Sequence, residues 1–372
     1  MITGLYHNTE PKILVRYTVR RKNRMKRIII IFMICMLAAG LCSGCSSDTA
    51  QGKTGDRLKI ITTIFPEYDW VKEILGDKAD KAELTLLLDN GVDLHSYQPT
   101  AGDILAVSGC DMFIYVGGES DAWVEDVLRT TANKHMAVIN LMEVLGSSVK
   151  TEETVEGMEH EHDHDEDGDH DHDHDEDHED ADHEDDHDHE EEYDEHVWLS
   201  LRNARIICGV IADKLAELDP DNAGDYKANY EAYDKKLSAL DEQIGSVVGA
   251  ASVKTLLFGD RFPFRYLTDD YGLAYYAAFS GCSAETEASF KTIVFLADKV
   301  NELKLPAILT IENSDGKIAS TIRENTADKN QKILQLHSLQ SVTSKDIEKG
   351  ASYISIMNDN IAVLKEALEV SE

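Results

Sequence analysis

Between Leu58 and Leu141 the chain alternates short apolar runs with amphipathic stretches, and this alternation restricts the fold more than any other feature. The apolar runs, which are rich in β-branched and aliphatic residues, are LKIITTIF, AELTLLL, DMFIYVG and MAVINL. Such runs predict strands that are buried in a parallel sheet. The stretches between them, such as YDWVKEILGD and WVEDVLRTT, have the apolar spacing of a helix. Alternating strands and helices predict an α/β lobe.

The same alternation returns near the C-terminus, so the sequence predicts two α/β lobes. TLLFGD, LAYYAAF and PAILTIENSD are strand-like, whereas KTIVFLADKVNEL and YISIMNDNIAVLKEALE have helical spacing. A chain of 372 residues, 42% of them hydrophobic, can bury two separate cores. We predict an N-terminal lobe at 58–200, linking helices at 201–250 and a C-terminal lobe at 251–372. The linking segment is either one long helix or two packed helices that meet near Pro220.

The N-terminus has the features of a bacterial lipoprotein leader. Residues 28–41 form an apolar run that is short for a membrane span but typical of a signal peptide. The small residues directly before Cys45 resemble a lipobox, in which the cysteine is lipidated. We predict an upstream extension at 1–24, a signal peptide at 25–44 and a lipidated tether at 45–57, with an ordinary secretory leader as the alternative. Both place the mature protein outside the cytoplasm, and a lipid on Cys45 would anchor it to the extracytoplasmic face of the cell membrane.

Residues 160–189 form a run of alternating histidine and acid. Of these thirty residues ten are His, eighteen are Asp or Glu and none is Lys or Arg, so the run cannot build a core and we predict a disordered loop at 157–193. Imidazoles suit borderline metals such as zinc, and carboxylates concentrate cations. We interpret the run as an auxiliary metal-collecting loop or sensor; the alternative is a solvated acidic loop with incidental metal affinity. Its histidines are His160, His162, His164, His170, His172, His174, His178, His183, His187 and His189.

The net charge and the cysteines argue against other functions. The net charge of −35 includes −18 from the run, so the rest of the chain, at −17, is still acidic. This charge argues against nucleic acid as a partner, because phosphate binding needs a basic surface. Outside the leader the cysteines are Cys110, Cys208 and Cys282, and no CxxC spacing occurs among them. They indicate neither a disulfide framework nor a Cys-ligated zinc site, and we predict three small buried residues.

Two histidines outside the run stand where ligands are expected. In an α/β sheet, ligands bind outside the carboxyl ends of the strands. His95 lies in the loop DNGVDLHSYQPT, directly after the strand-like AELTLLL. His196 lies in DEHVWLS, where flanking apolar residues indicate a folded site. A single loop histidine is more often a surface residue, so the residues alone leave both interpretations open for His95.

The two histidine segments together resemble those of a known family. GVDLHSYQPT resembles the G-x-D-P-H-x-Y-E-P-T loop, and DEHVWLS the D-P-H-x-W-L/M-S/D segment, of the zinc- and manganese-binding proteins of ABC importers, the ZnuA/TroA-like cluster A-I family. The resemblance runs from about Leu58 to Leu368 and implies that His95 and His196 are metal ligands. It also implies a TroA-like fold, in which a long backbone helix joins two lobes with parallel sheets. The sequence departs from the family pattern at Leu94, Gln98 and Glu195.

The family's other ligand positions are matched less clearly. The third family ligand, a histidine, aligns with Gly259, which leaves Asp260 as the nearest replacement unless a neighbouring arginine pairs with it. At the last metal motif, where many relatives have aspartate, this chain has His337 in ILQLHSL. Glu312 follows PAILTI at another predicted carboxyl end. The resemblance therefore implies a zinc site of His95, His196 and His337, completed by Asp260, Glu312 or water.

On these grounds we expect an extracytoplasmic zinc-binding receptor that delivers Zn²⁺ to an ABC importer permease. Imidazole ligands favour zinc over manganese, which prefers carboxylates. A manganese or iron receptor of the same family, and a surface adhesin involved in cell adhesion or a zinc buffer, are the alternatives. We do not expect an enzyme, because the ligand loops resemble those of a binding protein and no GxSxG motif occurs. We expect a lipid-anchored monomer whose protein partner is the permease.

Overall fold

The computed structural model describes residues 57–158, 192–283 and 287–370. The predicted upstream extension, signal peptide and lipidated Cys45 lie outside the described residues, as do the ten histidines of the acidic run. None of the helices in the described ranges combines the length and the apolar character that a membrane span requires. The description below concerns the folded unit that begins at Asp56.

The first sheet has the strand order β2-β1-β3-β4, and its neighbouring strands are all parallel. All four side chains of β3 are buried, as the unbroken apolar run MFIY predicts. Each strand is followed by a helix, so the predicted alternation is confirmed for this lobe. The strands are β1 (Leu58–Thr62), β2 (Ala82–Leu86), β3 (Met112–Tyr115) and β4 (Ala137–Asn140), and the helices are α2 (Phe65–Leu75), α3 (Ala101–Gly109), α4 (Trp123–Thr130) and α5 (Leu141–Leu145).

The second sheet has the order β6-β5-β7-β8 and is also parallel. The pairing of β5 with β6 shifts in register between Phe258 and Arg261, so β5 is irregular at Gly259 and Asp260. The strands are β5 (Thr255–Phe262), β6 (Ala274–Ser280), β7 (Ala307–Thr310) and β8 (Lys332–Gln335). The helices between and after them are α8 (Arg265–Tyr271), α9 (Phe290–Leu303), α10 (Lys317–Asn325) and α11 (Ser344–Glu348).

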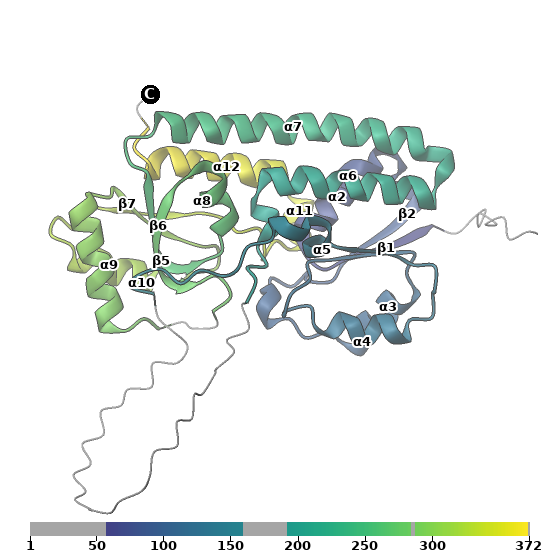
Figure 1. Cartoon of the computed structure of the whole chain (residues 1–372), viewed down its shortest axis with the longest axis horizontal. Coiled ribbons are helices and arrows are strands. Elements are labelled where there is room, and N and C mark those ends of the chain that lie inside the picture. Colours follow the sequence, from purple (N-terminus) through teal and green to yellow (C-terminus); the bar gives the residue numbers. More distant parts are fainter. Residues whose placement is uncertain (1–56, 159–191, 284–286, 371–372) are drawn as a thin grey trace, which may run out of the picture. The chain divides into compact units, whose positions relative to one another are not determined.

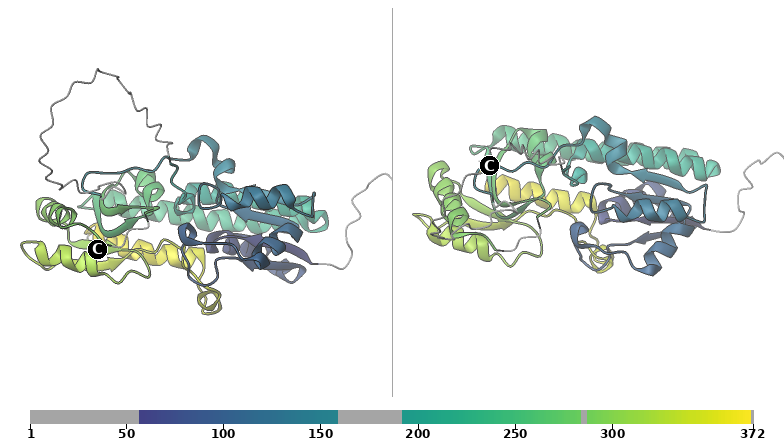
Figure 2. Two further views of the ribbon diagram at one scale, coloured as in Figure 1. Left: turned by 90° about the horizontal axis from the view of Figure 1, so that it is seen from below. Right: turned by 60° about the horizontal axis from the view of Figure 1, so that its bottom comes forward.

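A long helix, α7 (Ala223–Ala250), contacts both lobes (Figures 1 and 2). At its first half the Asn229 amide donates to the carbonyl oxygen of Ile74 in α2, at 3.0 Å. At its second half Asp241 accepts a hydrogen bond from the hydroxyl of Tyr271 in α8, at 2.8 Å. The predicted backbone helix is therefore confirmed. A second helix, α6 (Leu201–Leu218), packs against α7 and is separated from it by a short turn at Pro220.

The last helix, α12 (Tyr353–Ala367), also contacts both lobes. The Tyr353 N–H donates to the Asp69 carboxylate of α2 at 2.8 Å, and the Tyr353 ring packs edge-on against Trp70, with centroids 5.3 Å apart. At the other end of α12, Glu366 pairs with Lys332 of β8. Two helices therefore hold the lobes together, which fixes the distance between loops that belong to different sheets.

Candidate metal site

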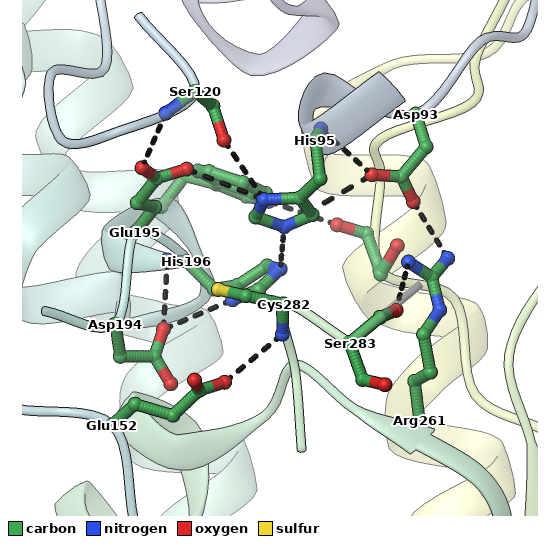
Figure 3. A network of polar contacts seen from close by, with 12 residues as sticks. Asp93, His95, Ser120, Glu152, Asp194, Glu195, His196, Arg261, Cys282 and Ser283 are labelled. Carbon is green, nitrogen blue, oxygen red and sulfur yellow. Dashed lines mark hydrogen bonds and ion pairs between the residues drawn. The ribbon is translucent and has the colours of Figure 1, made fainter. Parts of the chain in front are cut away.

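His95 and His196 point their ring nitrogens at one another (Figure 3). Their Nε2 atoms are 3.2 Å apart and their ring centroids are 5.1 Å apart. Two nitrogens that bind one tetrahedral zinc ion at about 2.0–2.1 Å lie about 3.3–3.4 Å from each other. The separation in this structure therefore suits two ligands of a single ion with little movement of either ring.

The His95 ring is oriented by contacts on its other nitrogen. His95 lies in the short 3-10 helix Leu94–Ser96 in the loop after β2, where the Asp93 side chain accepts the His95 N–H at 3.0 Å. Ring Nδ1 lies 2.9 Å from the Ser120 hydroxyl and 3.4 Å from the carboxylate of Glu195. Burial works to raise the pKa of Glu195, but the hydrogen bond and charge of His95 hold it below its ordinary value. An ionised carboxylate beside Nδ1 leaves Nε2 as the nitrogen for a metal.

His196 is oriented in the same way and is fully buried. Asp194 accepts the backbone N–H of His196 at 2.8 Å, and the same oxygen lies 2.9 Å from ring Nδ1. Burial works to lower the pKa of His196, but the charge and hydrogen bond of Asp194 raise it above its ordinary value. The next ring along the chain, Trp198, packs 5.2 Å from the imidazole and donates its indole N–H to the carbonyl oxygen of Ser338 at 2.8 Å. These contacts fix the ring so that Nε2 faces His95.

Cys282 supplies a third donor beside the two rings. One donor atom from each of His95, His196 and Cys282 lies within 4.8 Å of the others, and among the described residues these three side chains form the group that could hold a metal ion. Cys282 comes just after β6, at a strand's carboxyl end, and its N–H donates to Glu152 at 3.0 Å. Burial raises the pKa of the Cys282 thiol.

Glycine at position 281 permits this close approach. A Cβ atom on Gly281 would lie 2.9 Å from the carbonyl oxygen of Phe262 and 3.0 Å from Cε1 of His196. Real Cβ atoms are essentially never closer than 3.0 Å to other heavy atoms, so a larger residue would push the loop away from the imidazole. Gly281 therefore lets the second-lobe loop reach the first-lobe histidine.

Polar contacts around the rings also join the two lobes. Arg261 of β5 donates to the Asp93 carboxylate at 2.7 Å and to the carbonyl oxygen of Ser283 at 3.4 Å. With its amide nitrogen turned towards Asp93, buried Gln340 donates to that carboxylate at 3.0 Å, and its amide oxygen lies 2.9 Å from Nε2 of His196. Burial works to raise the pKa of Asp93, but Arg261 and His95 lower it. Asp93 is therefore an ionised centre that joins the His95 loop to the second lobe.

The carboxylates predicted as further ligands are engaged elsewhere. Asp260 accepts the backbone N–H groups of Arg261, at 2.9 Å, and Ile311, at 3.4 Å. Glu312 accepts both the N–H and the hydroxyl of Ser338, at 2.7 Å and 2.6 Å. Neither belongs to the group formed by the two histidines and Cys282. The structure does not bring either carboxylate together with the two imidazoles, and the roles of Asp260 and Glu312 as ligands stay predictions.

His337 is also outside that group. Its Nδ1 accepts the N–H of Leu339 at 2.9 Å and lies 3.4 Å from the carboxylate of Glu312. Its backbone N–H donates to Asn360 of α12 at 2.8 Å. His337 thus belongs to a second polar cluster, at the carboxyl end of β8, and its role as a ligand stays a prediction.

Sequence reasoning missed Cys282 as a candidate ligand and did not identify the pairing of Arg261 with Asp93. An isolated cysteine without CxxC spacing was expected to be a small buried residue. Its position directly after the strand-like LAYYAAFS is the same kind of signal that singled out His95, and it would have marked Cys282 as a candidate. The sequence leaves open whether a neighbouring arginine pairs with Asp260; in the structure the guanidinium of Arg261 pairs with Asp93 instead.

The chain is similar to known zinc proteins over most of its length. It is 28% identical over 342 residues to the high-affinity zinc uptake system protein ZnuA of Bacillus subtilis, covering 92% of this chain and 97% of that protein. It is 30% identical over 340 residues to the zinc-binding lipoprotein AdcA of Streptococcus pneumoniae, covering 90% of this chain but 61% of that longer relative. The crystal structure of the Zn(II)-bound ZnuA-like domain of S. pneumoniae AdcA matches with a TM-score of 0.62 at 26% identity, covering 84% of this chain and 99% of that domain.

The sequence pattern of one family covers nearly all of the folded unit. The family is described as ZnuA, zinc-uptake complex component A, periplasmic, and it matches residues 60–367. This range contains both parallel sheets except the first two residues of β1, together with the long helix α7 and the three clustered donors. The chain therefore belongs to the ZnuA family of zinc-uptake components.

Proposed function

We propose that this protein is an extracytoplasmic receptor that captures Zn²⁺ and delivers it to the membrane permease of an ABC importer. The observation that carries the proposal is the 3.2 Å separation of the Nε2 atoms of His95 and His196. Membership of the zinc-uptake family, and the zinc-binding relatives ZnuA and AdcA, support zinc as the transported ion. Imidazole ligation favours zinc over manganese, so a manganese or iron receptor is the less favoured alternative.

The residues behind the two rings prepare them for the ion. Asp194 and Glu195 each face the Nδ1 atom of one imidazole, which places the proton on Nδ1 and the lone pair on Nε2. A carboxylate behind a ligating imidazole also makes that imidazole a better electron donor. Because both rings are held before an ion arrives, little ordering of side chains opposes capture.

The leader and the acidic run complete the proposed mode of action. Lipid on Cys45 would keep a monomeric receptor at the membrane surface, close to the permease. The ten histidines of the run would bind zinc weakly and raise its concentration near the site. The alternative for the run is a solvated acidic loop. Both proposals rest on sequence composition and on the lipoprotein name of the relative AdcA.

A zinc titration of single-alanine variants tests the capture site. His95→Ala and His196→Ala should each weaken the tightest zinc site by at least about 100-fold, because loss of an outer-shell partner alone costs 10- to 100-fold. His135→Ala is the matched control, since this histidine is exposed and lies outside the cluster. Competition against a chelator separates the tight site from weak binding by the run. Wild-type affinity in both test variants would refute the proposed site.

Two further experiments separate the remaining alternatives. A deletion strain should need added zinc for growth, and the wild-type gene but not the His95→Ala gene should remove that need. Rescue by both genes would favour an adhesin or a buffer. The predicted ligand roles of three further residues are tested by zinc titration of Asp260→Asn, Glu312→Gln and His337→Ala beside the control His135→Ala. Weaker zinc binding supports the role of a residue, and unchanged binding removes that residue from the ligand set.

A further inference from the structure

A tetrahedral ion that is bound by two imidazoles needs at least one more protein ligand. Zinc sites take four ligands, and sites that must release or exchange something keep three protein ligands and one open position. Both histidines come from the first lobe, so a third ligand from the second lobe would let the ion hold the two lobes together. The second-lobe side chains nearest to the rings are therefore the ones to consider.

We propose that the Cys282 thiolate is the third metal ligand, so that the site is N₂S and takes a borderline or soft divalent cation. This inference rests on the proposed function and specifies its ligand set. The cysteine donor atom lies within 4.8 Å of the donor atoms of both histidines. Figure 3 shows the Cys282 side chain beside the facing rings.

The distances allow all three donors to bind one ion. With bonds of about 2.3 Å to sulfur and about 2.0–2.1 Å to nitrogen, a tetrahedral zinc ion places sulfur about 3.6 Å from each nitrogen. The longest separation in the cluster is at most 4.8 Å, so closure needs a shift on the order of 1 Å. The Cys282 backbone is tied by its hydrogen bond to Glu152, and Gly281 keeps the loop against His196. A change of side-chain rotamer can supply the remaining shift.

Other second-lobe side chains are less suited to this position. The carboxylate of Asp260 accepts two backbone N–H groups, and that of Glu312 accepts two groups of Ser338. Arg261 is close to the His95 loop but carries a positive charge, which a cation does not bind. Two neutral imidazoles and one thiolate would offset a single charge of the ion, and the buried Asp194 and Glu195 behind the rings supply further negative charge.

Sulfur ligation has a consequence for selectivity. Thiolates favour zinc over manganese, which prefers oxygen ligands. An N₂S site should therefore reject Mn²⁺ more strongly than a site in which a carboxylate takes the third position. Cys282→Asp should narrow the ratio of zinc to manganese affinity by weakening zinc binding and strengthening manganese binding.

Cobalt absorption tests the proposal directly, because the imidazoles and carboxylates of the acidic run contain no sulfur. We would load the full chain with one equivalent of Co²⁺ in a background in which Cys35, Cys42 and Cys45 are changed to serine. The expected spectrum has a thiolate-to-cobalt charge-transfer band in the near ultraviolet. Cys282→Ser should abolish this band and weaken zinc binding by at least about 100-fold.

The matched control is Cys110→Ser. Cys110 is buried in the first lobe and its thiol donates to the carbonyl oxygen of Val107, a contact that a serine hydroxyl can replace. This variant should keep the cobalt band and the zinc affinity. Zinc-edge X-ray absorption needs no Cys282 variant. The background protein, which keeps Cys282, should show one sulfur at about 2.3 Å from zinc when it is loaded with one equivalent of the ion.

The outcomes separate this inference from the proposed function. The role of Cys282 is overturned if the cobalt band persists in Cys282→Ser. It is also overturned if the background protein shows neither the cobalt band nor the zinc–sulfur distance. If His95→Ala and His196→Ala still weaken zinc binding in that case, the receptor function stands with a different third ligand. If neither histidine matters, the proposed function fails as well.

Discussion

Replacing Asp194 by asparagine should weaken zinc binding without removing a metal ligand. One carboxylate oxygen of Asp194 accepts the backbone N–H of His196 at 2.8 Å and lies 2.9 Å from its ring Nδ1. Asp194→Asn keeps an oxygen of the same shape but removes the negative charge behind the ring. Loss of such an outer-shell partner costs about 10- to 100-fold in affinity, or about 1.4–2.8 kcal/mol. Asp126→Asn, at an exposed position of α4, is the control and should leave zinc affinity unchanged.

The pH dependence of the same variant gives a second, independent readout. Burial lowers the pKa of His196 and Asp194 raises it, with a net result above the ordinary value of 6.5. Protons therefore compete with zinc at this nitrogen below that raised pKa, and affinity falls as the pH falls. Without the charge of Asp194, the largest contribution that opposes burial is lost and the pKa of His196 drops. The pH at which zinc affinity begins to fall should thus move downwards in Asp194→Asn, so that the difference from the wild type shrinks in acid.

Chelator competition at a series of pH values measures both effects. The expected result is a large loss of affinity near neutral pH that becomes smaller as the pH is lowered. An unchanged affinity in Asp194→Asn, or a loss that is the same at every pH, would refute the argument that Asp194 acts through the imidazole of His196.

Three more predictions follow from other parts of the structure. Burial raises the pKa of Glu67 to about 8 from 4.5, so the free energy of unfolding of the wild type should fall as the pH rises between these values, by an amount on the order of 5 kcal/mol. Glu67→Gln should remove this pH dependence, and urea unfolding at several pH values measures it. Gly281→Ala should weaken zinc binding and destabilise the fold by about 1–3 kcal/mol, whereas Gly245→Ala on α7, whose added Cβ meets no atom within 4 Å, should stabilise it by about 0.5–1 kcal/mol in thermal unfolding. Arg261→Gln should lower zinc affinity because it loosens the His95 loop. If the same substitution causes no loss of zinc affinity in an Asp93→Asn background, the arginine acts through this carboxylate.

Much of the fold could be predicted because buried parallel strands and amphipathic helices have different apolar periods. LKIITTIF and DMFIYVG became β1 and β3, and YDWVKEILGD lies within or just after α2. The break between the two linking helices was visible at Pro220, but which neighbours α7 contacts was not. Those contacts depend on pairs such as Tyr271 and Asp241, which are far apart in sequence and show no local pattern.

The candidate site could be predicted in part. His95 and His196 each lie in a distinctive local segment, and the structure brings their rings together. The strand-end position of Cys282 marks it as a candidate but does not pair it with the histidines, and Arg261 carries no comparable local signal. The partners of both residues depend on where the second sheet lies relative to the first. Sequence spacing cannot report that two strand ends from different sheets meet, so the third donor and the pairing of Arg261 with Asp93 emerged from the structure alone.

The contacts of Trp198 determine how late in synthesis the segment around His196 can be completed. This residue, two positions after His196, donates its indole N–H to the carbonyl oxygen of Ser338, and its own carbonyl oxygen accepts the hydroxyl of Tyr353. A growing chain exposes both histidines long before these two residues have been made. The segment that holds His196 is thus incomplete until the last helix begins to emerge, so the packing that fixes this imidazole requires a nearly complete chain.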